Sequence, residues 1–278
     1  MAAQTMQHAC VNGVKLEYDV TGQGEPVLLI SPVLADGFLP LLSEPSLAHG
    51  YRLITYHKRG WAGSTHTVPP VSVGDHAADA AALLAHLGVR RAHIVGHSSG
   101  AAVAAQLALL QPDIVHTLAL LELSLLSVPG AAGFMKKAGP AFEAYAAGDH
   151  ETALAVFMSA VSGLEWNACR TVLDSRVPGA VTAAIKDADT FFGVELPGLS
   201  AWTFGAAEAR RISQPVLSVR GTDTEPLWVE IAAVLRAWLP RLEGCTIDGA
   251  GHLLQLQRPE AVAQGLADFF GRHRMDVG

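Results

Sequence analysis

The sequence feature that most constrains this chain is a glycine-flanked serine, Gly-His-Ser-Ser-Gly at residues 96–100, set between two apolar segments. The apolar run 92–95 leads into it, and the alanine- and leucine-rich run 101–110 follows it. This order predicts a strand, a sharp turn and a helix, because only small residues fit beside so abrupt a turn. A serine at the apex takes a strained conformation with its hydroxyl projecting outward. Ser98 is therefore the first candidate for a nucleophile.

A serine hydroxyl is a poor nucleophile, so it needs a general base, and the base needs an orienting carboxylate. His252 is the natural base, because it follows Gly251 in a glycine-rich loop after the last predicted strand, 242–247. In a chain with 12 histidines the simpler alternative is a surface-loop histidine. The position after the last strand, together with the serine turn, favours catalysis. We interpret His97 as structural support, because neighbouring side chains diverge at such a turn.

Two carboxylates at strand ends compete for the third role. Glu122 follows the apolar strand predicted over 116–121, and Asp223 follows the next strand, 215–220. A charge in so apolar a stretch would cost several kcal/mol if it were buried without a partner, and a histidine that becomes cationic is such a partner. Asp223 has an easy alternative interpretation as an exposed turn aspartate. We favour Glu122 as the acid and keep Asp223 as the alternative.

Predicted strands and helices alternate along most of the chain. The strands cover 14–20, 27–30, 51–56, 92–95, 116–121, 215–220 and 242–247, with a hairpin turn at 11–14, and the helices cover 38–48, 71–87, 99–110, 227–239 and 259–272. This alternation implies a parallel sheet covered on both faces. From about 127 to 209 the pattern is helical and irregular. We therefore expect an α/β core formed by residues 1–126 and 210–278, interrupted by a helical lid, 127–209.

The bulk composition excludes several classes of protein. The chain has 278 residues, 50% of them hydrophobic, which suits one α/β domain with an insertion. A net charge of −7 without a Lys/Arg cluster argues against nucleic acid and anionic membranes as partners. Cys10, Cys169 and Cys245 are odd in number, widely spaced and without metal-type spacing, which indicates free thiols in a reducing compartment. With no visible signal peptide or long apolar run, we expect a cytoplasmic monomer or homodimer.

These motifs together resemble the α/β-hydrolase family, and the likeness covers nearly the whole chain. The matching stretches are 96–100, 251–252, the Arg-Gly-Trp-Ala-Gly-Ser loop at 59–64, and Arg-Pro-Glu at 258–260. The resemblance implies an α/β-hydrolase fold, a mostly parallel eight-stranded sheet flanked by helices with a helical lid. It also implies the chain order nucleophile, acid, histidine, and an oxyanion hole made by the backbone N–H groups of Val33 and Ser99.

Three positions depart from the usual family pattern. Residues 31–32 are Ser-Pro where relatives usually have His-Gly, and Gln257 stands where relatives often have glutamate. The Gly-x-x-Asp pattern of the usual acid ends here at Thr224, with Asp223 one residue early. One branch of the family, which includes the zearalenone-type lactone hydrolases, carries its acid after the preceding strand. This chain looks similar to that branch around 98–101 and around Glu122, which strengthens Glu122.

The residues and the resemblance together predict a serine hydrolase that cleaves a small-molecule carboxylic ester or lactone without a metal or organic cofactor. The aromatic-rich insert predicts an apolar pocket, with Leu34, Trp61, Trp166 and Phe191 as candidate substrate contacts. The same triad also serves cofactor-free haloperoxidases (perhydrolases), C–C bond hydrolases and acyltransferases, whereas Ser98 argues against the aspartate-nucleophile epoxide hydrolases and haloalkane dehalogenases. A ligand receptor that keeps the pocket without turnover is the alternative from another class.

Overall fold

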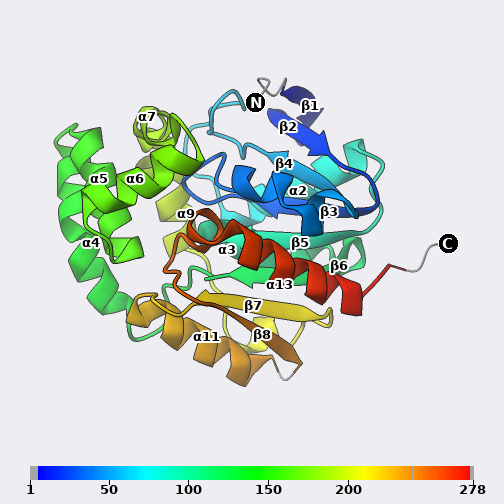
Figure 1. The fold of residues 1–278 in the computed structure, drawn as a ribbon. Helices are drawn as coiled ribbons and strands as arrows, with labels where there is room; N and C mark the ends of the chain where they lie inside the picture. Colours follow the sequence, from blue (N-terminus) through cyan, green and yellow to red (C-terminus); the bar gives the residue numbers. More distant parts are fainter. Residues whose placement is uncertain (1–5, 240, 276–278) are drawn as a thin grey trace.

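One eight-stranded sheet organises the computed structural model, which describes residues 6–239 and 241–275 (Figure 1). The strand order is β1-β2-β4-β3-β5-β6-β7-β8. The strands are β1 Gln7–Val11, β2 Val14–Thr21, β3 Glu25–Ile30, β4 Tyr51–Tyr56, β5 Ala92–His97, β6 Val115–Leu121, β7 Val216–Gly221 and β8 Leu242–Ile247. The β1–β2 hairpin pairs antiparallel with β4, and β3 to β8 run parallel. The predicted mostly parallel sheet is confirmed.

Helices cover both faces of this sheet. Successive strand residues point to opposite sides, so the apolar strands place side chains in a core on each face. Leu28 and Ile30 belong to a core that includes α2 (Val73–His86), α3 (Ser99–Leu110) and α11 (Pro226–Trp238), whereas Leu29 faces a second core. The second core contains η1 (Leu39–Ser43), α1 (Pro45–Ala48) and α13 (Pro259–Arg272), which crosses the sheet in Figure 1. The short elements η2 (Pro112–Ile114) and α12 (Leu254–Gln257) complete the core.

Local chemistry explains where two of these helices begin. Ser72 caps α2, because its hydroxyl accepts from the Asp75 N–H while the Asp75 carboxylate accepts from the Ser72 N–H. The single helix expected over 38–48 is instead η1 followed by α1. Pro45 is the reason, because a residue before proline is driven out of helical conformation and Glu44 is extended.

The irregular region between β6 and β7 forms a helical insertion, which we call the lid. It consists of α4 (Ala131–Ala146), α5 (His150–Ser162), α6 (Trp166–Arg176), α7 (Ala180–Lys186), α8 (Ala188–Thr190), the π-helical turn η3 (Phe191–Glu195), α9 (Leu196–Ser200) and α10 (Ala206–Ala209). Helices α4 to α7 stand to the left of the sheet in Figure 1. The lid therefore follows the strand that ends next to Glu122.

Three further observations bear on the expectations from composition. In residues 6–239 and 241–275, no helix is both long and apolar enough to cross a membrane. The same parts of the chain hold no group of three or more His, Cys, Asp or Glu side chains placed to bind a metal ion. Cys10, Cys169 and Cys245 are free thiols, as expected from their spacing.

Candidate active site

Ser98 sits at the sharp turn between β5 and α3. Its backbone has φ +55° and ψ −119°, a region that non-glycine residues rarely adopt. A Cβ on Gly96 would overlap the Gly100 carbonyl, and a Cβ on Gly100 would overlap the Ile30 carbonyl. The two glycines are therefore required by the close approach of strand and helix. Strain of this kind is common at functional sites.

Glu122 and His252 meet beside this turn. His252 Nδ1 lies 2.7 Å from Glu122 Oε2, and both side chains are buried. The Glu122 carboxylate accepts two further hydrogen bonds, from the Gly221 N–H on Oε1 and from the Thr224 hydroxyl on Oε2, each at 2.9 Å. The carboxylate keeps the proton of the histidine on Nδ1, which leaves Nε2 free to accept one.

The structure separates the two candidate acids. Asp223 is exposed at a turn, where its carboxylate accepts from the Thr222 hydroxyl at 2.9 Å. Thr224, which occupies the place of aspartate in the usual family pattern, donates to Glu122 instead. The geometry thus brings Glu122, and not Asp223, to His252. The catalytic role of this pair remains a prediction.

Further side chains hold His252 in place. Trp228, in the first turn of α11, stacks on the imidazole with ring centroids 3.9 Å apart and planes 9° apart. His97 Nε2 donates to the His252 carbonyl at 2.9 Å, while its Nδ1 lies 2.9 Å from Gln255 Nε2. Burial, together with the neighbouring His252, holds the pKa of His97 well below its usual range. A neutral His97 is consistent with the supporting role expected for it.

A second hydroxyl contacts the candidate nucleophile. Ser124 Oγ lies 3.0 Å from Ser98 Oγ, and the Ser124 N–H donates to the Ser98 carbonyl at 3.1 Å. Neither Ser124 nor Trp228 is among the residues predicted from the sequence. Ser124 lies two residues after Glu122, and no local motif marks it. Only the position of Trp228, at the start of the helix after β7, could have suggested it.

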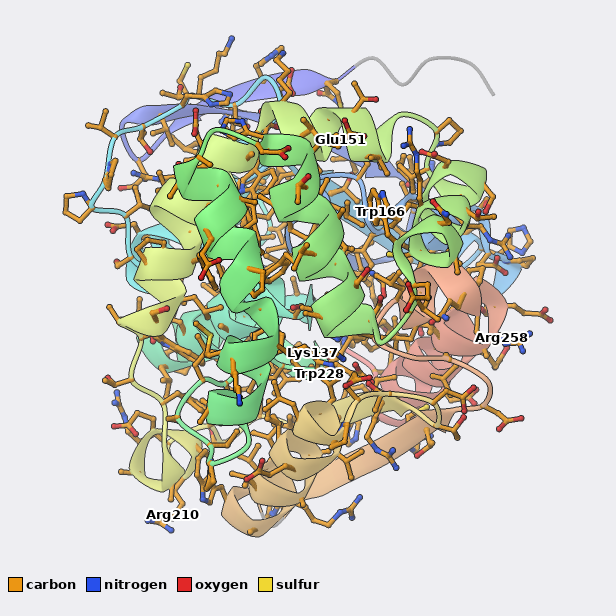
Figure 2. The ribbon with its side chains drawn as sticks, turned by 90° about the vertical axis from the view of Figure 1, so that its left-hand side faces the viewer. Lys137, Glu151, Trp166, Arg210, Trp228 and Arg258 are labelled. Atoms are coloured by element: carbon orange, nitrogen blue, oxygen red, sulfur yellow. The ribbon has the colours of Figure 1, made fainter. Side chains whose placement is uncertain are left out.

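Two neighbouring cavities both include Ser98 in their lining. The larger has a volume of about 210 Å³, and its apolar lining comes from the loop after β6, the lid and α11: Leu125, Leu126, Phe134, Met135, Phe142, Phe157, Val161, Phe192, Leu196, Pro197, Leu199, Leu227 and Trp228. The smaller, of about 30 Å³, is lined by Leu34, Phe191 and His252 among others. Figure 2 looks onto the lid, with α4 and α5 in front and Trp228, in the first turn of α11, at their lower end.

Only two of the four expected substrate contacts line these cavities, namely Leu34 and Phe191. Trp61 lines neither, because its indole N–H is directed to Glu195 and donates to it at 2.8 Å. Trp166 also lines neither cavity, since it is the first residue of α6 and packs half-buried against the core of the lid.

Both expected oxyanion donors border the smaller cavity beside Ser98. Ser99 is the first residue of α3, so its N–H has no acceptor within the helix and lies at the positive end of the helix dipole. Val33 lies in the loop after β3, and Asp36 Oδ1 of that loop contacts His57 Nε2 at 3.0 Å. Val33 and Ser99 thus both line the smaller cavity despite the departure at 31–32.

A family model for the α/β hydrolase fold matches residues 36–259. The chain belongs to the α/β-hydrolase family. Its relatives in this family carry different names. A Mycobacterium tuberculosis protein, provisionally named a non-heme bromoperoxidase, is 30% identical over 92% of this chain and 98% of its own. A soluble epoxide hydrolase from a Corynebacterium species is 23% identical over 96% of this chain and 97% of its own.

A solved structure extends the range of activities. The enzyme Est816, described as degrading N-acyl homoserine lactones, superimposes on this α/β hydrolase with a TM-score of 0.74 and 25% identity. The match covers 95% of this chain and all of that enzyme. One fold thus supports a haloperoxidase, an epoxide hydrolase and a lactonase by name. The reaction must be argued from the site.

Proposed function

We propose that this α/β hydrolase is a serine hydrolase that cleaves apolar or aromatic carboxylic esters or lactones through an acyl-enzyme. The observation that carries the proposal is the 2.7 Å contact between His252 and Glu122 beside the strained Ser98, which lines two neighbouring apolar cavities. A nucleophile, a base and an orienting carboxylate are the three parts that serine catalysis needs.

Each residue has a defined task in this mechanism. Ser98 Oγ attacks the carbonyl carbon as His252 Nε2 takes its proton, and Glu122 stabilises the imidazolium that results. The N–H groups of Val33 and Ser99 stabilise the oxyanion, and one such donor is typically worth about 3 kcal/mol. His252 then protonates the departing alkoxide. Water, deprotonated by the same imidazole, hydrolyses the acyl-enzyme.

The cavities support a neutral, largely apolar substrate. Within residues 6–239 and 241–275, the only polar side chains that line the larger cavity are the hydroxyls of Ser98, Ser124 and Ser200 and the indole of Trp228. A cavity of about 150 Å³ holds benzene, so about 210 Å³ accommodates one ring with a few further carbons or a medium-length chain. The smaller cavity is suited to the smaller group of the substrate.

A substrate panel tests this function. We expect kcat/KM for medium-chain and aryl esters, or for lactones with an apolar side chain, to exceed that for short polar esters at least about tenfold, because burial stabilises bound substrate by about 0.8 kcal/mol for each CH₂ group. Ser98→Ala should abolish turnover of every substrate. Faster hydrolysis of short polar esters would contradict the apolar-pocket argument, and turnover by Ser98→Ala would contradict the mechanism.

The bromoperoxidase name of the 30% identical relative favours perhydrolysis as a second candidate. Hydrogen peroxide would then attack the Ser98 ester in place of water and release a peracid. Measured on the same ester with and without peroxide, peracid formation faster than hydrolysis would favour this activity. C–C bond hydrolysis and acyl transfer are tested in the same panel with meta-cleavage diketones and with alcohol acceptors.

A further inference from the structure

A buried ion pair joins the lid to the residue that follows the candidate nucleophile. Glu195, the last residue of η3, accepts a 2.5 Å hydrogen bond on Oε1 from the Ser99 hydroxyl. Its Oε2 accepts from Lys58 Nζ at 2.7 Å and from the Trp61 indole at 2.8 Å. All four residues are buried. The carboxylate thus joins the lid, to which Glu195 belongs, to the loop after β4 and to the start of α3.

Such a pair is expensive to bury, since each ion loses several kcal/mol of hydration. Burial opposes the charge on Glu195, but Lys58 outweighs it and lowers the pKa of the carboxyl, which keeps it ionised. His76, close to both, does not add a charge at neutral pH, because burial and the nearby Lys58 lower its pKa to about 4. Burial lowers the pKa of Lys58, and Glu195 opposes this shift as the ion-pair partner 2.7 Å away.

Two other hydrogen bonds also join the lid to the loop after β4. The Thr190 hydroxyl donates to the Gly60 carbonyl at 2.6 Å, and Asp187 accepts from the Ala62 N–H at 2.9 Å. Both contacts tie the same part of the lid to the same loop, and neither reaches α3. Glu195 differs from them because it holds a side chain of α3 itself, that of Ser99, which lines the smaller cavity.

We propose that Glu195 is a positioning residue for the oxyanion hole. It acts through the Ser99 hydroxyl, and Lys58 neutralises its charge so that the carboxylate does not oppose the oxyanion. The inference rests on the proposed function, in which the Ser99 N–H is an oxyanion donor. Because the hydroxyl and the N–H belong to one residue at the free end of a helix, restraining the hydroxyl restrains the direction of the N–H. Small displacements at a reacting centre cost up to about 10²-fold in rate.

The proposal predicts a loss confined to the transition state. An oxyanion donor acts on charge that develops during the reaction, so its misalignment lowers kcat and leaves KM unchanged. A merely structural role would lower protein stability without separating these two constants. A trifluoromethyl ketone gives a second readout, because its hemiketal with Ser98 carries an oxyanion and reports on the hole without turnover.

Two variants remove the link by different routes. Ser99→Ala deletes the hydroxyl and keeps the N–H, and the double variant Lys58→Met/Glu195→Met removes both charges together with the acceptor of the Ser99 hydroxyl. We expect each to lower kcat and trifluoromethyl ketone affinity about tenfold with KM within about twofold, and their combination to add nothing further. Thr190→Val is the matched control. It deletes a lid anchor that does not touch Ser99, so kcat and ketone affinity should stay at the wild-type level.

The outcomes separate this inference from the proposed function. If wild type turns over, Ser98→Ala does not, and Ser99→Ala behaves like Thr190→Val, the positioning role is overturned and the function stands. Independent, multiplicative losses in the combined variant would also overturn it. Absence of turnover and of ketone binding in wild type would overturn the function and the inference together.

Discussion

Two buried carboxylates flank Ser98, and their partners differ. Glu122 extends from the sheet and is paired with His252, whose other ring nitrogen is free to exchange a proton with substrate. Glu195 extends from the lid and is paired with Lys58, and both side chains are buried. The first pair gains and loses a charge during the proposed reaction, whereas the second keeps its charges throughout. In these proposed roles, the partner rather than the carboxylate distinguishes proton transfer from positioning.

The largest effect on kcat is expected from substitution of Glu122, the carboxylate at the end of β6. Glu122→Gln should lower kcat about 10⁴-fold, because the amide no longer stabilises the imidazolium or its tautomer. Steady-state kinetics on the best ester measure this loss. Asp223→Asn is the control and should stay within about twofold, since Asp223 is exposed and bonded to Thr222. A severe loss in Asp223→Asn with a mild one in Glu122→Gln would reassign the acid.

Removing one charge of the Lys58–Glu195 pair should lower the stability of the protein. Lys58→Met leaves the Glu195 carboxylate buried without its cation and should reduce the free energy of unfolding by about 3–5 kcal/mol. Lys137, on the side of the lid that faces the viewer in Figure 2, forms an exposed pair with Glu225, and Lys137→Met should cost less than about 1 kcal/mol. Urea unfolding of both variants measures the difference. Equal, small losses would mean that the Lys58–Glu195 pair is not buried in solution.

Ser124 adds a smaller effect at the nucleophile itself. Its hydroxyl, 3.0 Å from Ser98 Oγ, can donate to that oxygen as the proton of Ser98 passes to His252. Ser124→Ala should therefore lower the acylation rate about tenfold, the loss expected for one hydrogen bond of about 1.4 kcal/mol. Stopped-flow measurement of the acylation burst tests this. An unchanged burst rate would show that the contact is incidental.

The smallest effect is a pH dependence of protein stability that arises from His57, which contacts Asp36 in the loop after β3. Burial opposes a charge on His57, but hydrogen bonds to Asp36 and Glu17 outweigh it and raise its pKa. A raised folded-state pKa stabilises the fold fully below about 6.5, and this contribution is lost as pH rises through the folded-state value. His57→Gln should therefore destabilise the protein more at pH 5.5 than at pH 8.5, by up to about 1 kcal/mol in urea unfolding. A difference of the opposite sign would contradict the assignment.

The sequence predicts the elements that local chemistry specifies. Strands β4 and β8 and helices α3 and α13 have the predicted bounds, because apolar runs end at glycine, proline or the serine turn. Long-range contacts are not marked in this way. Glu195 and Lys58 are 137 residues apart, so no local pattern relates them.

The aromatic residues of the site show the same limit. Trp61 and Trp166 are candidate contacts in the sequence, yet a hydrogen bond to Glu195 holds the Trp61 indole and packing within the lid holds Trp166. Trp228 stacks on His252 although its sequence surroundings resemble those of any amphipathic helix. Which aromatic side chain faces the cavity is decided by tertiary packing and not by its neighbours in the chain.

The central claim is that Ser98 is an activated nucleophile. Intact-mass spectrometry after treatment with a fluorophosphonate tests it most directly, because the reagent reacts with a serine only where a base activates it. We predict one adduct per chain on wild type, located on Ser98 by peptide mapping, and none on Ser98→Ala. An unlabelled wild-type protein, or equal labelling of Ser98→Ala, would contradict this account.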